Sequence, residues 1–171
     1  MVSELKGVNV PLTAEHLQAI GRICALWSSA ENVMEHLIWA MIPTSINYGR
    51  AITTHAPNEA RVNMIHALAN EKGLSDDIKG ELKSLTDNFN LLRDNRNEIV
   101  HSSWGGDAVE EIAHGYKPSA RGTFRLNTTY WSAVDISEVG KDIEDWIIHC
   151  VNLCERHFGW PPLLPVSSPS P

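Results

Sequence analysis

Residues 78–101 have the sequence IKGELKSLTDNFNLLRDNRNEIVH, and their apolar positions recur with the period of an α-helix. On a helical wheel Arg96 falls in the middle of the apolar stripe, whereas His101 lies on another face. The stretch therefore predicts a long amphipathic helix that carries an obligate cation at the centre of its buried side. The stripe itself consists of Ile78, Leu82, Leu85, Phe89, Leu92, Ile99 and Val100.

The flanking sequence predicts further helices on both sides of this one. Pro57 suits a first helical position, Gly73 suits a helix end, and Ser75 with two following aspartates is typical of a helix start. Asp135 and Glu138 resemble a capping box for a last helix that ends near Phe158. The predicted helices cover residues 13–41, 45–55, 57–73, 75–101 and 135–158.

Glu31 is an anomaly in the first predicted helix. The apolar positions of that helix keep a seven-residue rhythm in which Glu31 holds the missing place. Because a buried charge is normally paired, we expect Glu31 to accept hydrogen bonds from Arg96 or to lie within one water of it. The alternative is a bend near Ser28 and Ser29 that turns Glu31 to solvent. The rhythm is carried by Leu17, Ile20, Cys24, Trp27, Met34, Ile38 and Met41.

Residues 104–134 differ from the rest of the chain in composition. Glycines interrupt the helical pattern, residues 117–122 resemble a turn, and TFRLNTTYW at 123–131 is rich in β-forming residues. The predicted fold class is therefore mainly α, an antiparallel bundle of four to five helices with a small β-hairpin or flap inserted before the last helix. We expect one domain over residues 1–159 and a disordered Pro/Ser-rich tail over 160–171.

Composition and charge restrict the function. The 171 residues are 43% hydrophobic and 20% charged, with 14 basic and 21 acidic side chains and a net charge of −7. Such an acidic chain has no bulk electrostatic attraction for nucleic acid, so a few placed groups must hold any anionic ligand. The first residues resemble no signal peptide, no stretch is apolar enough for a membrane, and three scattered cysteines favour reduced thiols in the cytoplasm.

Two metal sites are conceivable from spacing. Glu98 and His101 form one Glu-x-x-His pair, but a di-iron bundle needs a second such pair and further carboxylates. Cys150, Cys154 and His157 share a face of the last helix, and Cys24 could complete a zinc set. Both helical cysteines also belong to an apolar stripe, where free cysteine packs as a small hydrophobe. We therefore predict core packing, with no metal and no other cofactor.

Arg96, Asn97 and His101 remain as the candidate site. The simplest interpretation is structural, with Arg96 extended to the surface or paired with an acid and His101 at the helix end. The functional alternative is RNA cleavage without a metal, which needs proton-transfer groups and a fixed cation for the phosphorane. Histidine and arginine supply these at neutral pH. In a regular helix the two side chains point about 140° apart, so we expect them to meet only if the last turn unwinds or a symmetric dimer forms.

The segment Arg96-Asn97-Glu98-Ile99-Val100-His101 resembles the Arg-Asn-x-x-x-His motif of the HEPN superfamily (higher eukaryotes and prokaryotes nucleotide-binding domains). The resemblance implies a dimeric helical bundle in which the Arg and His of both subunits line a shared cleft. Many HEPN proteins are metal-independent endoribonucleases of toxin–antitoxin, phage-defence and RNA-processing systems. Others have lost catalysis and serve as binding or assembly modules, which the acidic net charge also allows.

The resemblance assigns roles to single residues. His101 would be the general acid/base, Arg96 the phosphate clamp, and Asn97 would orient His101 or bind phosphate. Apart from the resemblance, Arg93 is a candidate second anion contact because it lies one turn before Asn97, and Glu31 is a supporting residue through its expected pairing with Arg96. The implied partners are RNA, a second copy of the chain and a candidate antitoxin protein, with no membrane.

Overall fold

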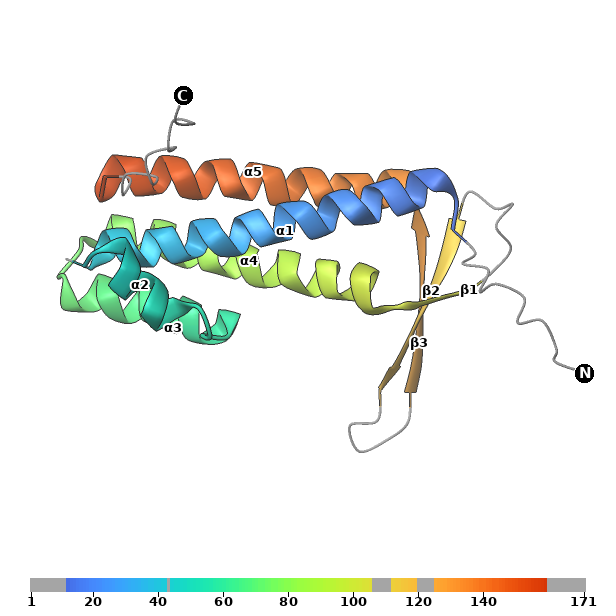
Figure 1. Cartoon of the computed structure of the whole chain (residues 1–171), viewed down its shortest axis with the longest axis horizontal. Coiled ribbons are helices and arrows are strands. Elements are labelled where there is room, and N and C mark those ends of the chain that lie inside the picture. The colour runs from blue at the N-terminus through green and yellow to red at the C-terminus, as the bar shows by residue number, and fades with distance from the viewer. Residues whose placement is uncertain (1–11, 43, 106–111, 120–124, 160–171) are drawn as a thin grey trace, which may run out of the picture. The chain divides into compact units, whose positions relative to one another are not determined.

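A computed structural model describes residues 12–42, 44–105, 112–119 and 125–159. Over these residues the fold is mainly helical with a small antiparallel sheet before the last helix, which confirms the predicted fold class (Figure 1). The predicted tail at 160–171 and half of the predicted turn, residues 120–122, lie outside the described residues. The elements are α1 (Ala14–Met41), α2 (Ile46–Thr53), α3 (Asn58–Glu71), α4 (Asp76–His101), β1 (Ser103–Gly105), β2 (Ile112–Ser119), β3 (Arg125–Ser132) and α5 (Ala133–His157).

The chain divides into two compact units. The first unit comprises Met1–Ala25 and Arg93–Lys141, and the second comprises Leu26–Leu92 and Asp142–Pro171. Each of the three long helices α1, α4 and α5 thus contributes one segment to each unit. The single domain expected over residues 1–159 stays a prediction. No helix in the described part of the chain is long and apolar enough to span a membrane.

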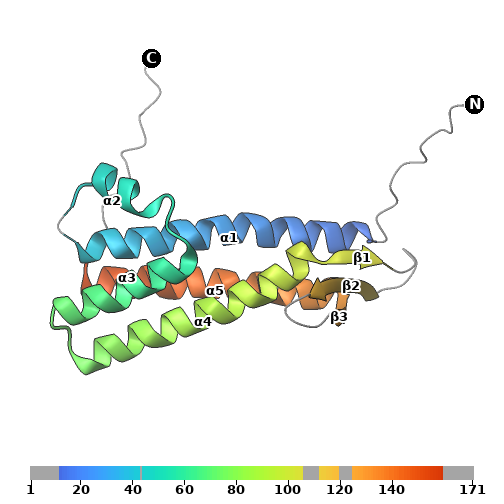
Figure 2. The same ribbon diagram turned by 90° about the horizontal axis from the view of Figure 1, so that it is seen from below.

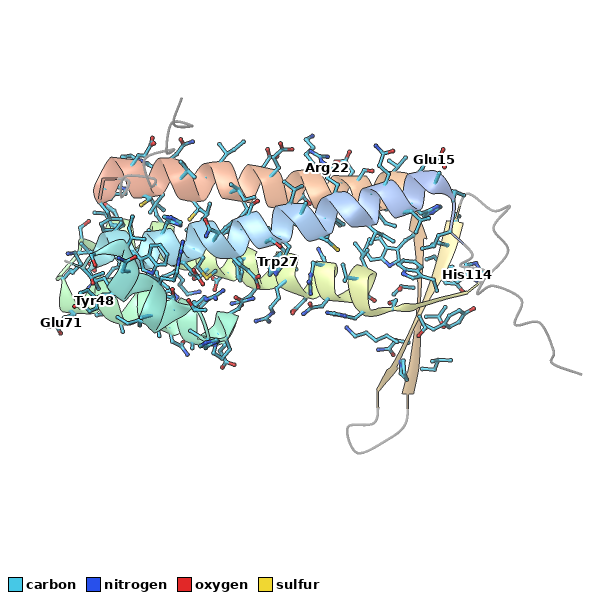
Figure 3. All side chains as sticks on the ribbon, in the orientation of Figure 1. Glu15, Arg22, Trp27, Tyr48, Glu71 and His114 are labelled. Atoms are coloured by element: carbon cyan, nitrogen blue, oxygen red, sulfur yellow. The ribbon has the colours of Figure 1, made fainter. Side chains whose placement is uncertain are left out.

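A row of aromatic rings forms the core of the second unit. The ring of Phe89 on α4 stacks on Trp27 of α1 at 4.8 Å and contacts Trp146 of α5 at 5.0 Å (Figure 3). The indole of Trp146 also donates a buried hydrogen bond of 2.9 Å to the Leu85 carbonyl. Leu82, Leu85 and Phe89 are almost wholly buried. The apolar stripe predicted for α4 is therefore the side that the second unit buries.

Polar contacts hold α2 and α3 to the α1 segment of the same unit. Figure 2 shows the ribbons of these helices. Arg61 on α3 is buried and forms a 2.6 Å ion pair with Glu35 of α1. The Trp39 indole on α1 donates to the Thr53 hydroxyl at the end of α2 over 3.1 Å. After α3, Gly73 has a φ of +60°, a left-handed conformation that glycine adopts without a Cβ penalty. The predicted stop at Gly73 is thus confirmed.

The buried side of α1 differs from the predicted rhythm. Leu17 is 52% exposed, and the core positions of the first half of the helix are instead Ala19 and Ile23. Further along, Ala30 is 1% exposed, whereas Glu31 beside it is half-buried. The predicted seam was therefore wrong by one residue in this part of α1. Small alanines at the true core positions gave too weak an apolar signal to reveal the offset.

The first unit contains a three-stranded antiparallel sheet in the order β1-β2-β3 (Figure 1). Trp104 pairs with Gly115 across β1 and β2, and His114 pairs with Tyr130 across β2 and β3. The predicted hairpin is therefore confirmed, but β1 was not expected. Strand β2 also continues to Ser119, beyond the predicted start of the turn.

The start of α5 carries a capping box that differs from the predicted one. The Asp135 carboxylate accepts hydrogen bonds from the Ser132 amide at 3.0 Å and the Ser132 hydroxyl at 2.6 Å. The Asp135 amide donates back to the Ser132 hydroxyl at 3.1 Å. The expected box of Asp135 with Glu138 was wrong because α5 begins at Ala133, which makes Ser132 the capping residue. These hydrogen bonds from Ser132 lower the pKa of the Asp135 carboxyl.

Candidate functional site

The end of α4 positions the candidate motif. Arg96, Asn97 and His101 lie in the last two turns of the helix, which remains α-helical through His101. The Ser102 hydroxyl then donates a 2.5 Å hydrogen bond back to the Glu98 carbonyl, and the chain enters β1 at Ser103. The motif is thus held between a regular helix and the first strand of the sheet.

Arg96 and His101 are in contact within one chain. Nη1 of Arg96 lies 3.1 Å from Nε2 of His101 and donates a 2.9 Å hydrogen bond to the Asn97 side-chain oxygen. The expectation that the two side chains need an unwound turn or a second subunit to meet was therefore wrong. Five residues correspond to a rise of about 7.5 Å, and the long arginine side chain spans that rise along an intact helix.

The contact is a hydrogen bond in only one form of the histidine. A guanidinium carries only donors, so Nε2 of His101 accepts this hydrogen bond only when it is unprotonated. The imidazole is then neutral, with its proton on Nδ1. Arg96 is half-buried with its Nε atom shielded from solvent, whereas His101 is exposed. The arrangement places an accessible base directly beside a fixed positive charge.

Asn97 and Arg93 each have a polar partner beside the motif. The side-chain oxygen of Asn97 accepts from Arg96, so Asn97 orients the arginine. Arg93 forms an ion pair with the neighbouring Asp94 through Nε at 3.2 Å and Nη2 at 3.0 Å. Asp94 is largely exposed, and such surface pairs contribute little energy. An anionic ligand could therefore compete for Arg93, whose role as a second anion contact stays a prediction.

Glu31 has a partner that the sequence did not indicate. Its carboxylate accepts a 2.9 Å hydrogen bond from the Asn58 side-chain amide on α3. Glu31 belongs to the second unit and Arg96 to the first, so the predicted contact between them stays a prediction. The half-buried position of Glu31 is explained by its place beside the core position of Ala30 and by the bond from Asn58.

The cysteines of α5 are core residues, as predicted. Cys150 and Cys154 are both fully buried. Burial raises the pKa of the Cys154 thiol to about 11 and raises the pKa of Cys150 further above its usual range. Both thiols are therefore protonated at neutral pH. Among the described residues no group of three or more His, Cys, Asp or Glu side chains is arranged to hold a metal ion.

One buried histidine was overlooked in the sequence. His16 is 1% exposed, its Nδ1 lies 2.8 Å from the Thr13 hydroxyl, and its Nε2 lies 3.2 Å from the Trp131 carbonyl. These contacts tie the start of α1 to the end of β3. The spacing of Thr13 and His16 at a helix start was the available signal. Because both ring nitrogens are engaged, His16 is a structural link within the first unit.

A surface hollow in the second unit does not include the motif. It lies between α4 and α5 and is lined by Asn88, Leu91, Leu92, Asp142, Asp145, Trp146 and His149. The contact of Arg96 with His101 therefore stands as the candidate site by its own geometry.

Comparisons of the chain with protein-family models, with curated proteins and with solved structures find no match.

Proposed function

We propose that this protein is a metal-independent endoribonuclease of the HEPN type that uses Arg96 and His101. The observation that carries the proposal is the 3.1 Å approach of the guanidinium to the imidazole. A phosphate clamp and a proton-transfer group must act on one phosphodiester, so they must lie this close together. Asn97 supports the site by holding the arginine, and Arg93 is the nearest further cation on the same helix.

The proposed reaction is an internal phosphoryl transfer, in which the RNA supplies both the attacking and the leaving oxygen. The 2′-oxygen of the substrate attacks phosphorus while the bond to the 5′-oxygen breaks, which leaves a 2′,3′-cyclic phosphate and a 5′-hydroxyl. The phosphate attracts Arg96, and Nε2 of His101 is then free to take the 2′-hydroxyl proton. Arg96 stabilises the charge that develops on the phosphorane oxygens.

The proton balance is the reason to propose a dimer. The leaving 5′-oxygen needs a proton, and one histidine cannot act as base and acid within a single step. A second copy of the chain would supply a protonated His101 across a two-fold axis. If both histidines are needed, an equal mixture of wild-type and His101→Ala subunits after exchange should keep about a quarter of the activity. Independent sites would keep about half, as expected for random pairing in a symmetric dimer.

The proposal extends to the biological setting. We place the protein in the cytoplasm, with RNA as substrate and an antitoxin protein as the candidate regulator of a toxin or defence activity. A catalytically silent binding or assembly module is the second candidate. The net charge of −7 favours it, because an acidic chain gains little from general attraction to RNA.

The test is RNA cleavage in the presence of EDTA. We expect a 2′,3′-cyclic or 3′-phosphate and a 5′-hydroxyl, with activity reduced about 10²- to 10⁴-fold by His101→Ala. Arg96→Lys should also be impaired, because lysine keeps the charge and loses the planar fork. His55→Ala is the matched control, since His55 is an exposed histidine of the second unit.

Three results would contradict the proposal. Activity that EDTA abolishes and Mg²⁺ restores would refute the mechanism. Equal activity of His101→Ala and His55→Ala would refute the site. Binding of RNA without cleavage by the wild-type dimer would favour the silent module.

A further inference from the structure

One face of the sheet carries three rings, of which Tyr130 is exposed and His114 and Tyr116 are half-buried. Successive side chains of a strand alternate between faces and directly paired residues share a face, so the register places His114, Tyr116 and Tyr130 together. Ile112 and Leu126 lie on the same face. Tyr130 is 65% exposed, Leu126 is 55% exposed and Ile112 is 49% exposed. We call these five residues the aromatic face.

The rings of this face are supported from within the sheet. The His114 and Tyr130 rings meet edge-on at 4.9 Å (Figure 3, where His114 is labelled). The Tyr116 ring lies so close to Gly105 of β1 that a Cβ there would come within 2.6 Å of Tyr116 Cε2. Tyr130 is therefore the ring most open to a ligand, whereas Tyr116 is packed across the neighbouring strand.

The opposite face of the sheet is the one that the protein buries. Ala113 is 4% exposed and Gly115 is buried. A Cβ on Gly115 would come within 3.2 Å of Ser102, the residue that ends α4. The hairpin thus has its packed side opposite the aromatic face, and core packing does not account for the exposed tyrosine.

The charge of the hairpin differs from that of the whole chain. Residues 112–132 carry Lys117, Arg121 and Arg125 and no acidic residue, although the chain has a net charge of −7. The acidic residues nearest in sequence are Asp107, Glu110 and Glu111 before it and Asp135 after it. The register places Lys117 on the opposite face and no carboxylate on the aromatic face, so no described residue of this face repels a polyanion, and rings suit its unpaired bases.

The sheet also continues directly from the candidate active site. His101 precedes β1 by two residues, and four residues separate it from Gly105, a span of at most about 14 Å. Gly105 pairs with His114, which pairs with Tyr130, so two strand spacings of about 5 Å complete the path. The two ends are therefore at most roughly 15–20 Å apart, so a strand of about five nucleotides, even at the duplex spacing of 3.4 Å, is long enough to reach both.

We propose that the aromatic face binds unpaired bases of single-stranded RNA whose backbone reaches Arg96 and His101. The choice of RNA rests on the proposed function, and the stacking itself rests on the rings. A protein partner fits less well, because standard protein interfaces engage about 20–30 residues on each side, and this face presents five. Stacking on aromatic rings tolerates any base, so it selects unpaired strands over duplex without selecting a sequence.

The binding test uses a labelled 2′-O-methyl octanucleotide, in which the attacking hydroxyl is blocked, and fluorescence anisotropy at fixed salt. Tyr130→Ala should weaken binding by about 5- to 100-fold, the range for loss of one stacked base. Tyr130→Phe should bind like wild type, because it keeps the ring. Tyr48→Ala is the matched control, since Tyr48 is a 72% exposed tyrosine on α2 in the second unit (Figure 3).

The proposal is overturned if wild type does not bind the single strand, or if Tyr130→Ala binds it as wild type does. Equal binding of the same sequence as a duplex, with equal dependence on Tyr130, also overturns it. Loss of binding in Tyr130→Phe would assign the effect to the hydroxyl and overturn stacking. Circular dichroism melts of each variant establish that the fold is retained, as expected for so exposed a side chain.

Cleavage kinetics separate this proposal from the proposed function. Tyr130→Ala should raise KM for an octanucleotide and leave kcat/KM for a dinucleotide unchanged, because the dinucleotide is too short to reach β3. RNA binding that depends on Tyr130 in a wild-type protein without cleavage would refute the nuclease and support the binding face. Cleavage of both substrates unaffected by Tyr130→Ala would support the nuclease and refute the binding face.

Discussion

Replacing Arg61 tests whether the buried ion pair of the second unit holds α3 in place. Arg61 donates to Glu35 of α1 at 2.6 Å, to the Asn58 side chain at 3.1 Å and to the Thr53 carbonyl at 3.2 Å. The Arg61 side chain is 9% exposed and that of Glu35 is 13% exposed. Arg61→Met therefore removes the charge that compensates a largely dehydrated carboxylate.

The expected cost follows from that burial. Removing one partner of a buried ion pair costs about 3–5 kcal/mol. Glu35 keeps some exposure to water, and methionine packs as an apolar side chain. Both lower the cost, so Arg61→Met should reduce the free energy of unfolding by about 3 kcal/mol. The double change Arg61→Met with Glu35→Leu should return to within about 1 kcal/mol of wild type, because no unpaired charge then remains. Nε of Arg61 is buried without a hydrogen-bond partner among the described residues, so removing the arginine also relieves an existing penalty.

The assay is urea unfolding followed by tryptophan fluorescence, with the free energy of unfolding extrapolated to water. Lys83→Met is the control, because Lys83 and Asp87 form an ion pair whose side chains are 68% and 60% exposed. It should change the free energy of unfolding by no more than about 0.5 kcal/mol. A cost for Arg61→Met no larger than that for Lys83→Met would refute the reasoning. If the double variant were no more stable than Arg61→Met, the unpaired carboxylate of Glu35 would not be the cause of the lost stability.

Three further predictions concern local packing, pH and assembly. Gly49→Ala should lower the free energy of unfolding by about 1–3 kcal/mol, because its Cβ would lie 2.6 Å from the buried Trp39 ring. Gly80→Ala is the control: a Cβ there has nothing within 4 Å, so it should raise the free energy of unfolding by up to about 1 kcal/mol in the same denaturation assay. Asp135→Asn should lower the melting temperature at pH 7. The lowered pKa of Asp135 gives stability that is present above its ordinary value of 3.8 and lost as the pH falls through the folded value, so the two melting curves should converge in acid, and a constant gap would contradict this. Sedimentation equilibrium should find a dimer at low concentration, and a monomer throughout would contradict the shared proton-transfer site.

The long helices were the part of the fold that could be predicted. The stripe of α4 is recognisable because large apolar residues such as Leu82 and Phe89 repeat at the helical period and are buried in the structure. The seam of α1 was predicted one residue away because alanines at positions 19 and 30 fill the core with little hydrophobic signal. Strand β1 was missed since three residues, Ser103 to Gly105, are too few to establish a period.

The residues of the candidate site could be predicted from their types and spacing, but their hydrogen-bond partners could not. Arginine, asparagine and histidine at this spacing indicated phosphate chemistry, but no sequence pattern indicated that Asn97 would bond to Arg96. The partner of Glu31 was equally hidden, because Asn58 lies on another helix. The exposed ring of Tyr130 was obscured for a different reason. Alternating residues show that a strand has two faces and do not show which of them is covered.

The central position of Arg96 on an apolar stripe has a physical explanation in the reach of its side chain. A helical wheel represents each residue by a direction from the axis and ignores length, and on that basis Arg96 and His101 cannot meet. The guanidinium is carried on a long stem that can pack along apolar surface while its charged end approaches polar groups. Arg96 accordingly has a shielded Nε and an Nη1 that lies 3.1 Å from an exposed histidine. Because one chain can assemble this pair alone, the proposed dimer serves the second proton transfer of the proposed reaction and is not needed for the geometry of the site.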